Sequence, residues 1–155
     1  MDVLAHSLWS YALFKDSAGL WFAVLLGVIP DLLVFTVPFI QMLIKRNIPK
    51  SAPDPKTIPA WVYRGYDLTH SLVIWAVLFV LVYILTKNWY LPLLAWAVHI
   101  IIDIPTHSKQ FFPTPFLWPL SDYKFDGLSW AEGWFMAVNY GALALVFFLI
   151  ILKII

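Results

Sequence analysis

Four segments of the chain are apolar over enough length to cross a lipid bilayer, and this limits the folds open to it. A spanning helix needs about 20 mostly apolar residues. The segments are residues 18–44, 69–86, 89–106 and 131–155. Hydrophobic residues make up 62% of the 155 residues and charged residues 12%, against about 45–50% and about 25% in soluble domains. The sequence therefore predicts an all-α, polytopic membrane protein with about four spans, built as a single domain over residues 1–155.

A shorter apolar segment, residues 3–15, precedes the first predicted span. Its pattern is helical, but it has too few residues to cross a bilayer. Asp2 stands directly before it and is of a residue type that caps helix N-termini. We therefore expect a short N-terminal helix that reaches partway into the membrane or lies at its surface.

Two connecting segments are long and differ in character. The loop over residues 45–66 holds five of the ten basic residues: Lys45, Arg46, Lys50, Lys56 and Arg64. Positive charge favours the cytoplasmic side of a membrane, so we expect this loop there. Residues 107–130 are rich in proline and aromatic side chains, and we expect them to pack back on the helices or lie at the membrane interface. The chain has no cysteine and therefore neither a disulfide framework nor a thiolate metal site. It also has no basic tract that would indicate nucleic acid, so the partner expected from the apolar composition is the lipid bilayer.

Ionisable residues within the apolar segments are costly in a membrane, and by default they indicate a functional site. They are His6, Asp31, His70, His99, Asp103 and, at the end of a span, His107. Residues four apart on a helix are offset by only about 40° and rise about 6 Å. His99 and Asp103 should therefore share one face. His107 continues the spacing, but Pro105 places it at or beyond the helix end.

With the basic loop on the cytoplasmic side, these residues fall at matching depths in the cytoplasmic half of the bundle. Helical bundles build metal sites from facing side chains in this way. Imidazole and carboxylate without thiolate favour zinc, with manganese or iron as alternatives. We predict His6, Asp31, His70, His99 and Asp103 as ligands. Five ligands are more than one tetrahedral ion takes, so either two ions bind or some of these residues orient the ligands or act as a general base. We predict His107 as a further ligand or a catalytic proton shuttle.

Two other interpretations use the same residues. A chain of histidines and aspartates can carry protons or ions across a membrane, which would make the protein a non-enzymatic transporter. Buried polar groups can also serve only to hydrogen-bond helices together. The concentration of all four histidines with two carboxylates favours the metal site over both.

Three polar residues outside the apolar core are secondary candidates. Asp67 precedes His70 by three residues and could share its helical face. It could be a metal ligand, but a catalytic partner of His70 or part of a helix N-cap is favoured. Arg64 and Lys109 are placed to bind the phosphate of a substrate or a lipid head group. Ordinary positive-inside charges are the alternative interpretation of both.

Five short motifs together resemble the integral-membrane, metal-dependent hydrolase family of the LexA-regulated bacterial inner-membrane type. They are "AHSLWSYAL" at 5–13, "GVIPDL" at 27–32, "LTHSLVIW" at 68–75, "HIIIDIPTH" at 99–107 and "FLWPLSD" at 116–122. They occur in the order of that family and cover most of the chain apart from residues 45–60 and the last span. Family members often carry a His-Arg-Gly element before the Thr-His-Ser, and here Tyr63 replaces that histidine before Arg64 and Gly65.

The resemblance implies metal-associated roles for His6, Asp31, His70, His99 and Asp103, and a bacterial or archaeal cell membrane as the location. The ligand order is also similar to that of zinc-dependent phospholipase C and related nucleases, which cleave phosphodiesters. The function expected on both grounds is hydrolysis of a phosphoester or ester of a lipid or other amphipathic small molecule. A hydroxide held by the metal would be the nucleophile.

Overall fold

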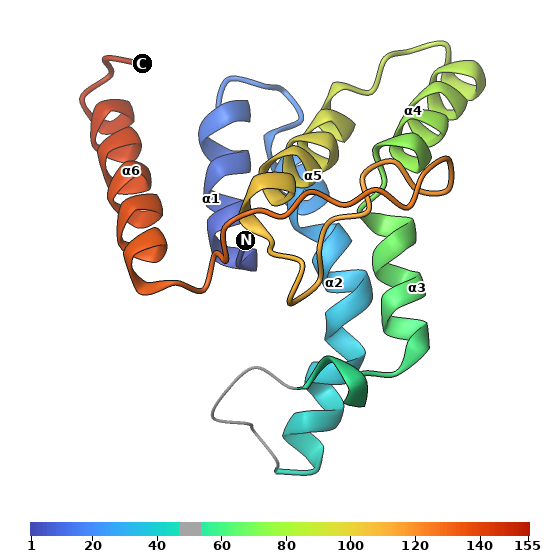
Figure 1. Cartoon of the computed structure of the whole chain (residues 1–155). Helices are drawn as coiled ribbons and strands as arrows, with labels where there is room; N and C mark the ends of the chain where they lie inside the picture. Colours follow the sequence, from blue (N-terminus) through green and yellow to red (C-terminus); the bar gives the residue numbers. More distant parts are fainter. Residues whose placement is uncertain (47–53) are drawn as a thin grey trace.

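The computed structural model describes residues 1–46 and 54–155, and this part of the chain is helical without strands (Figure 1). The all-α prediction is therefore confirmed. The α-helices are α1 (Val3–Phe14), α2 (Leu20–Ile44), α3 (Ala60–Thr69), α4 (Leu72–Thr86), α5 (Leu94–Thr106) and α6 (Gly133–Ile151), and the short 3₁₀ helices η1 (Pro55–Thr57) and η2 (Leu91–Leu93) precede α3 and α5.

The short N-terminal helix forms as predicted. A carboxylate oxygen of Asp2 accepts a hydrogen bond from the backbone N–H of Ala5 at 2.9 Å, which caps α1. α1 packs closely on α2 because Gly27 has no side chain: a Cβ at this position would overlap Oγ of Ser10. This close approach brings the middle of α2 toward the centre of the molecule.

The predicted loop over residues 45–66 is partly helical, because α3 begins at Ala60. Val62, Tyr66 and Thr69 are buried, and their spacing of four and then three residues puts them on one helical face. That periodicity drives the helix against α2. Residues 47–53, with the basic Lys50, lie outside the described residues.

A break at His70 and Ser71 separates α3 from α4, and the direction of the chain bends by 54° between the two helices. The hydroxyl of Ser71 accepts from the backbone N–H groups of Val73 and Ile74, each at 3.1 Å, and so caps α4. The segment expected as a continuous span from residue 69 thus starts with a sharp turn. His70 lies at this turn.

Among the described residues, two helices, α2 and α6, are long and apolar enough to cross a membrane, and α3 with α4 adds a third candidate if the bent pair is one span. The helical segment Leu91–Thr106 is apolar but shorter. α6 lies at the edge of the bundle beside α1 (Figure 1), where Trp9 donates to the Asn139 amide oxygen at 3.0 Å. The structure therefore supports a helical membrane protein with two or three such helices.

Residues 107–130 pack back on the helices, as predicted. The backbone N–H of Leu72 donates to the carbonyl of Phe116 at 3.0 Å, and the Ser71 hydroxyl donates to the carbonyl of Trp118. Gly127 donates to the carbonyl of His107 at 2.9 Å. Figure 1 shows this segment crossing in front of α5, so it covers one side of that helix.

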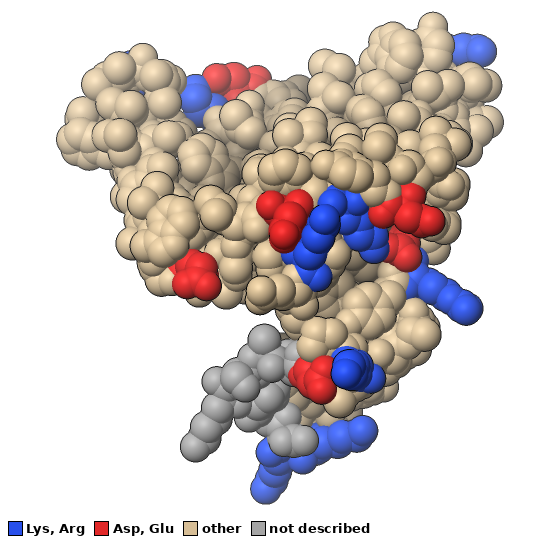
Figure 2. All heavy atoms as spheres, viewed as in Figure 1, with Lys and Arg blue, Asp and Glu red and all other residues tan. Residues whose placement is uncertain are grey.

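Charged side chains on the face shown in Figure 2 gather mainly in a band below the apolar bundle and on the projecting lower part of the molecule. The apolar helices above the band carry charge mainly at their far ends. An ion pair between Lys124 and Asp67, at 3.6 Å, joins the 107–130 segment to α3. The distribution fits a protein whose helical ends meet water.

Candidate metal centre

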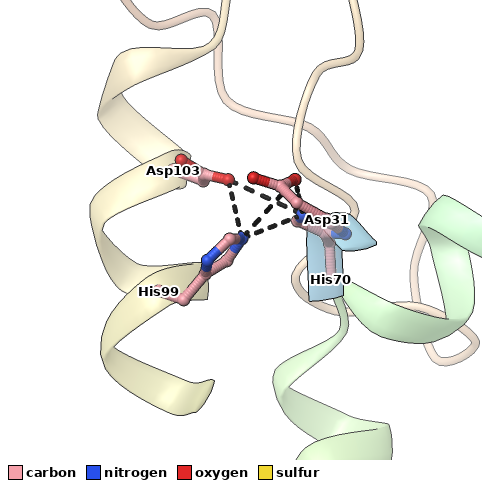
Figure 3. Close-up of side chains that lie close together, drawn as sticks. All are labelled: Asp31, His70, His99 and Asp103. Carbon is pink, nitrogen blue, oxygen red and sulfur yellow. Dashed lines mark hydrogen bonds and ion pairs between the residues drawn. The ribbon is translucent and has the colours of Figure 1, made fainter. Parts of the chain in front are cut away.

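Four buried side chains from three parts of the fold converge at one point (Figure 3). Asp31 comes from the middle of α2, His70 from the break between α3 and α4, and His99 and Asp103 from α5. One nitrogen or oxygen atom from each residue lies within 4.8 Å of the corresponding atoms of the others. We call these four residues, which could hold a metal ion, the metal cluster.

Four distances within the metal cluster are close to the edges of a small coordination polyhedron, and a fifth, from Nε2 of His99 to Oδ1 of Asp31, is longer at 3.9 Å. Nε2 of His99 is 3.1 Å from Nε2 of His70 and 3.2 Å from Oδ2 of Asp103. Nε2 of His70 is 3.4 Å from Oδ1 of Asp31 and 3.6 Å from Oδ2 of Asp103. Ligands about 2.0–2.1 Å from a tetrahedral ion lie about 3.3 Å from one another. The residues present therefore fit one small divalent cation.

A hydrogen bond to a residue outside the metal cluster orients the imidazole ring of His99. Its Nδ1 lies 2.7 Å from the carbonyl oxygen of Gly27, and a carbonyl can only accept. Nδ1 therefore carries the proton, and Nε2 of the neutral ring presents its lone pair to the cluster. Metal-binding histidines commonly use a backbone carbonyl in this way.

Asp103 provides the clearest sign that these residues can hold a cation. It is completely buried, and within the described part of the chain its Oδ2 has no hydrogen-bond partner. Burying a carboxylate oxygen without a partner costs free energy. Asp31 adds a second buried carboxylate, whose Oδ1 lies 3.4 Å from Nε2 of His70 and 3.9 Å from Nε2 of His99. A divalent cation at the centre would satisfy both carboxylates.

The other oxygen of Asp103 faces a second group of residues. Nε2 of His6 lies 3.0 Å from Oδ1, and the amino group of Met1 also contacts this oxygen. The His6 ring stacks on that of His99, with 3.7 Å between ring centroids. His6 thus adjoins the metal cluster without belonging to it, and its predicted role as a ligand stays a prediction.

His107 lies just past the end of α5, as the position of Pro105 predicted. Its Nε2 is 3.3 Å from the Met1 amino group. Burial lowers the pKa of His107 to about 3, against the opposing effect of the Asp103 carboxylate. The ring is therefore neutral at ordinary pH and able to accept a proton or bind a metal.

Tyr66 is a site residue that the sequence analysis missed. It is buried, and its ring stacks on that of His70 with 3.8 Å between centroids. Its hydroxyl donates to the Phe112 carbonyl at 3.0 Å and lies 3.0 Å from Nδ1 of His107. Because the single hydroxyl proton goes to Phe112, the oxygen accepts from Nδ1–H of His107. Tyr66 thereby leaves Nε2 of His107 as the acceptor nitrogen.

The secondary candidates lie outside the metal cluster. Asp67 is half-buried and pairs with Lys124. Arg64 and Lys109 are exposed, and the backbone N–H of Lys109 donates to Asp126 at 2.8 Å. The proposed roles of Asp67, Arg64 and Lys109 stay predictions.

A cavity of about 230 Å³ gives access to one side of the metal cluster. Asp31, Tyr66 and His107 line its polar end, and Phe35 and Phe112 belong to its apolar wall. A group bound there would meet a carboxylate of the cluster and the His107 ring together. The arrangement combines a cation site, a neutral histidine and an open approach.

Comparison with protein-family models, with curated proteins and with solved structures finds no match for this chain. The resemblance to the membrane hydrolase family therefore depends on its ordered motifs alone.

Proposed function

We propose that the protein is a membrane-embedded, metal-dependent hydrolase that cleaves a phosphoester or ester of a lipid or other amphipathic molecule. The observation that carries the proposal is the convergence of two imidazole nitrogens and two carboxylates on one buried point. The partnerless Oδ2 of Asp103 supports a cation there over a purely structural hydrogen-bond cluster. We place the protein in the hydrolase family that the five motifs resemble.

The metal would be held by Asp31, His70, His99 and Asp103. A divalent ion held there would supply Lewis-acid chemistry and would make water available as a nucleophile at neutral pH. Zinc is the first candidate because the donors are nitrogen and oxygen in near-tetrahedral spacing, with manganese and iron as alternatives. If a second ion binds, Asp103, His6 and His107 would hold it, in place of the Met1 amino group that contacts Asp103 and His107.

The chain's own residues would then manage the substrate and its protons. His107 is neutral, lines the cavity and is oriented by Tyr66, which suits it to accept or pass on a proton. Exposed Arg64 and Lys109 would attract an anionic head group. Asp67, which pairs with Lys124, would act through the position of that lysine.

We infer that the chain crosses the membrane four times, through α2, the bent pair α3–α4, the segment Leu91–Thr106 and α6. The exposed apolar side chains along these segments support this topology. The basic residues at the C-terminal end of α2 favour the cytoplasm for that end. The metal centre would then lie in the cytoplasmic half of a bacterial or archaeal cell membrane.

The test is elemental analysis of purified protein after mild extraction. We expect stoichiometric zinc, or another divalent metal, in the wild type, and at least a tenfold loss in Asp103→Ala and His70→Ala. Asp16→Ala, which alters an exposed aspartate paired with Lys15, should retain the metal. A wild-type protein free of metal would overturn the proposal. Two ions in the wild type and one in His6→Ala would identify the second ion.

Catalysis is tested separately with p-nitrophenyl esters of phosphate, phosphodiesters and fatty acids. We expect cleavage of at least one class by the metal-loaded wild type, and none by Asp103→Ala. The transport alternative predicts movement of metal ions or protons into proteoliposomes through the wild type, without hydrolysis. That result, with stoichiometric metal, would reject the hydrolase and retain the metal site.

A further inference from the structure

An apolar groove between the C-terminal half of α2 and the start of α3 adjoins the cavity at the metal cluster. The cavity and the groove share four lining residues: Phe35, Phe111, Phe112 and Trp130. Asp31 and His107 lie at the cavity end, and Met42 and Ile58 lie at the far end of the groove. A single molecule could therefore occupy both spaces.

The groove has the size and lining of a binding site for a hydrocarbon chain. Its volume is about 520 Å³, within the range of about 300–1,000 Å³ found for small-molecule sites. Phe35, Phe39 and Met42 follow one another at spacings of four and three residues, so they form one face of α2. Val62 and Pro59 complete the opposite wall from the side of α3. No charged side chain of the described residues lines this groove.

Phe112 forms the boundary between the two spaces and is held in an unusual conformation. Its φ of 49° lies in the left-handed region, which bulky side chains seldom adopt. The hydrogen bond from Tyr66 to its carbonyl and stacking of its ring on Tyr63, at 4.9 Å between centroids, keep it there. Strain of this kind persists where surrounding contacts fix it, often at ligand sites. The wall that the cavity and the groove share is thus a defined feature of the fold.

We propose that the substrate carries one long unbranched hydrocarbon chain, which lies in this groove while its polar ester or phosphoester reaches the metal cluster. The inference rests on the proposed function, because the metal cluster fixes which end of the ligand is polar. Asp31 and Met42 are eleven positions apart, about 16 Å along α2. The groove therefore selects chains by length as well as by polarity.

The test measures binding of alkyl phosphates, from butyl to hexadecyl, and of inorganic phosphate to metal-loaded protein in nanodiscs. Empty nanodiscs correct for partition into lipid. Each methylene that enters the groove should strengthen binding about fourfold, and the gain should stop once the chain reaches Met42. Equal affinity for inorganic phosphate and dodecyl phosphate would overturn the proposal.

Met42→Trp supplies the matched variant, because it fills the outer end of the groove. The gain should then stop at shorter chains, while affinity for butyl phosphate stays unchanged. Leu43→Trp makes the same kind of change on the neighbouring residue, which is 46% exposed and does not line the groove. It should behave as the wild type. Identical chain-length profiles for the two variants would also reject the groove.

Metal content separates failure of this inference from failure of the proposed function. Met42→Trp and Leu43→Trp leave the metal cluster untouched, so both should carry the wild-type amount of metal. Stoichiometric metal with no dependence on chain length rejects the groove alone. Absence of metal from the wild type rejects the hydrolase, whatever the alkyl phosphates do.

Discussion

Nε2 of His70 lies 3.1 Å from Nε2 of His99, and both nitrogens face the carboxylates of Asp31 and Asp103. While His99 is neutral, its proton is engaged at the Gly27 carbonyl. The four atoms that face one another are Nε2 of His70, Nε2 of His99, Oδ1 of Asp31 and Oδ2 of Asp103. At most one proton, on Nε2 of His70, is then left to be shared among them. A cation relieves this excess of acceptors better than any hydrogen-bond pattern available to the four side chains.

Removal of metal should therefore lower the thermal stability of the wild type. A ligand that binds only the folded state adds about 2.7 kcal/mol at a concentration one hundred times its Kd. We expect Tm to fall by several degrees when a chelator is added and to recover with zinc. His99→Ala, which lacks one ligand, should show the same Tm with and without chelator. A chelator-insensitive wild type would argue against a metal in the cluster.

Asp31→Asn should have opposite effects in the presence and absence of metal. Without metal, the amide removes one buried negative charge and can donate to Nε2 of His70. We therefore expect the free energy of unfolding to increase by about 1–3 kcal/mol, and Tm to rise with it. With zinc, the variant should gain far less stability than the wild type. Asp67→Asn is the control, since Asp67 pairs with Lys124 outside the cluster. A metal-free Asp31→Asn protein less stable than the wild type would contradict the argument.

Tyr66→Phe should destabilise the protein without removing the metal. The change deletes the hydroxyl that bonds the Phe112 carbonyl and the His107 ring; leaving both buried groups without it costs about 1–3 kcal/mol. Zinc content should be unchanged, because no ligand of the cluster is altered. Tyr63→Phe removes an exposed hydroxyl bonded to the carbonyl of Pro55, and should change stability by less than about 0.5 kcal/mol. Loss of zinc from Tyr66→Phe would mean that Tyr66 also fixes the cluster.

The central pair of the site could be predicted because it depends on local geometry. His99 and Asp103 share a helical face by their spacing alone, and the structure places Nε2 and Oδ2 3.2 Å apart. The N-terminal helix and its Asp2 cap were predictable for the same reason. Asp31 and His70 join the pair through tertiary packing, and only their matching depth in the membrane suggested it.

Tyr66 could not be assigned in this way. Its position four residues before His70 places the two on one helical face, but its hydroxyl gains a role only when residues 107–130 return over the helices. The break at His70 was missed for a related reason. The span predicted from residue 69 carries no proline or glycine at this point, and the turn depends on Ser71 bonding Trp118, which is distant in the sequence.

Gly27→Ala should destabilise the protein by separating α1 from α2. The added Cβ would overlap the Ser10 hydroxyl between two packed helices, and overpacking of this kind costs about 1–3 kcal/mol. The shift would also disturb the bond between the Gly27 carbonyl and His99, so zinc affinity should fall as well. Adding Ser10→Gly to Gly27→Ala should restore much of the stability and the zinc affinity.

Gly141→Ala in α6 is the control, because a Cβ at this position would meet nothing within 4 Å. It should leave zinc affinity unchanged and raise stability slightly, as alanine favours helices. Equal effects of the two glycine substitutions in a thermal-unfolding assay would rule out the close approach of α1 and α2 as the cause.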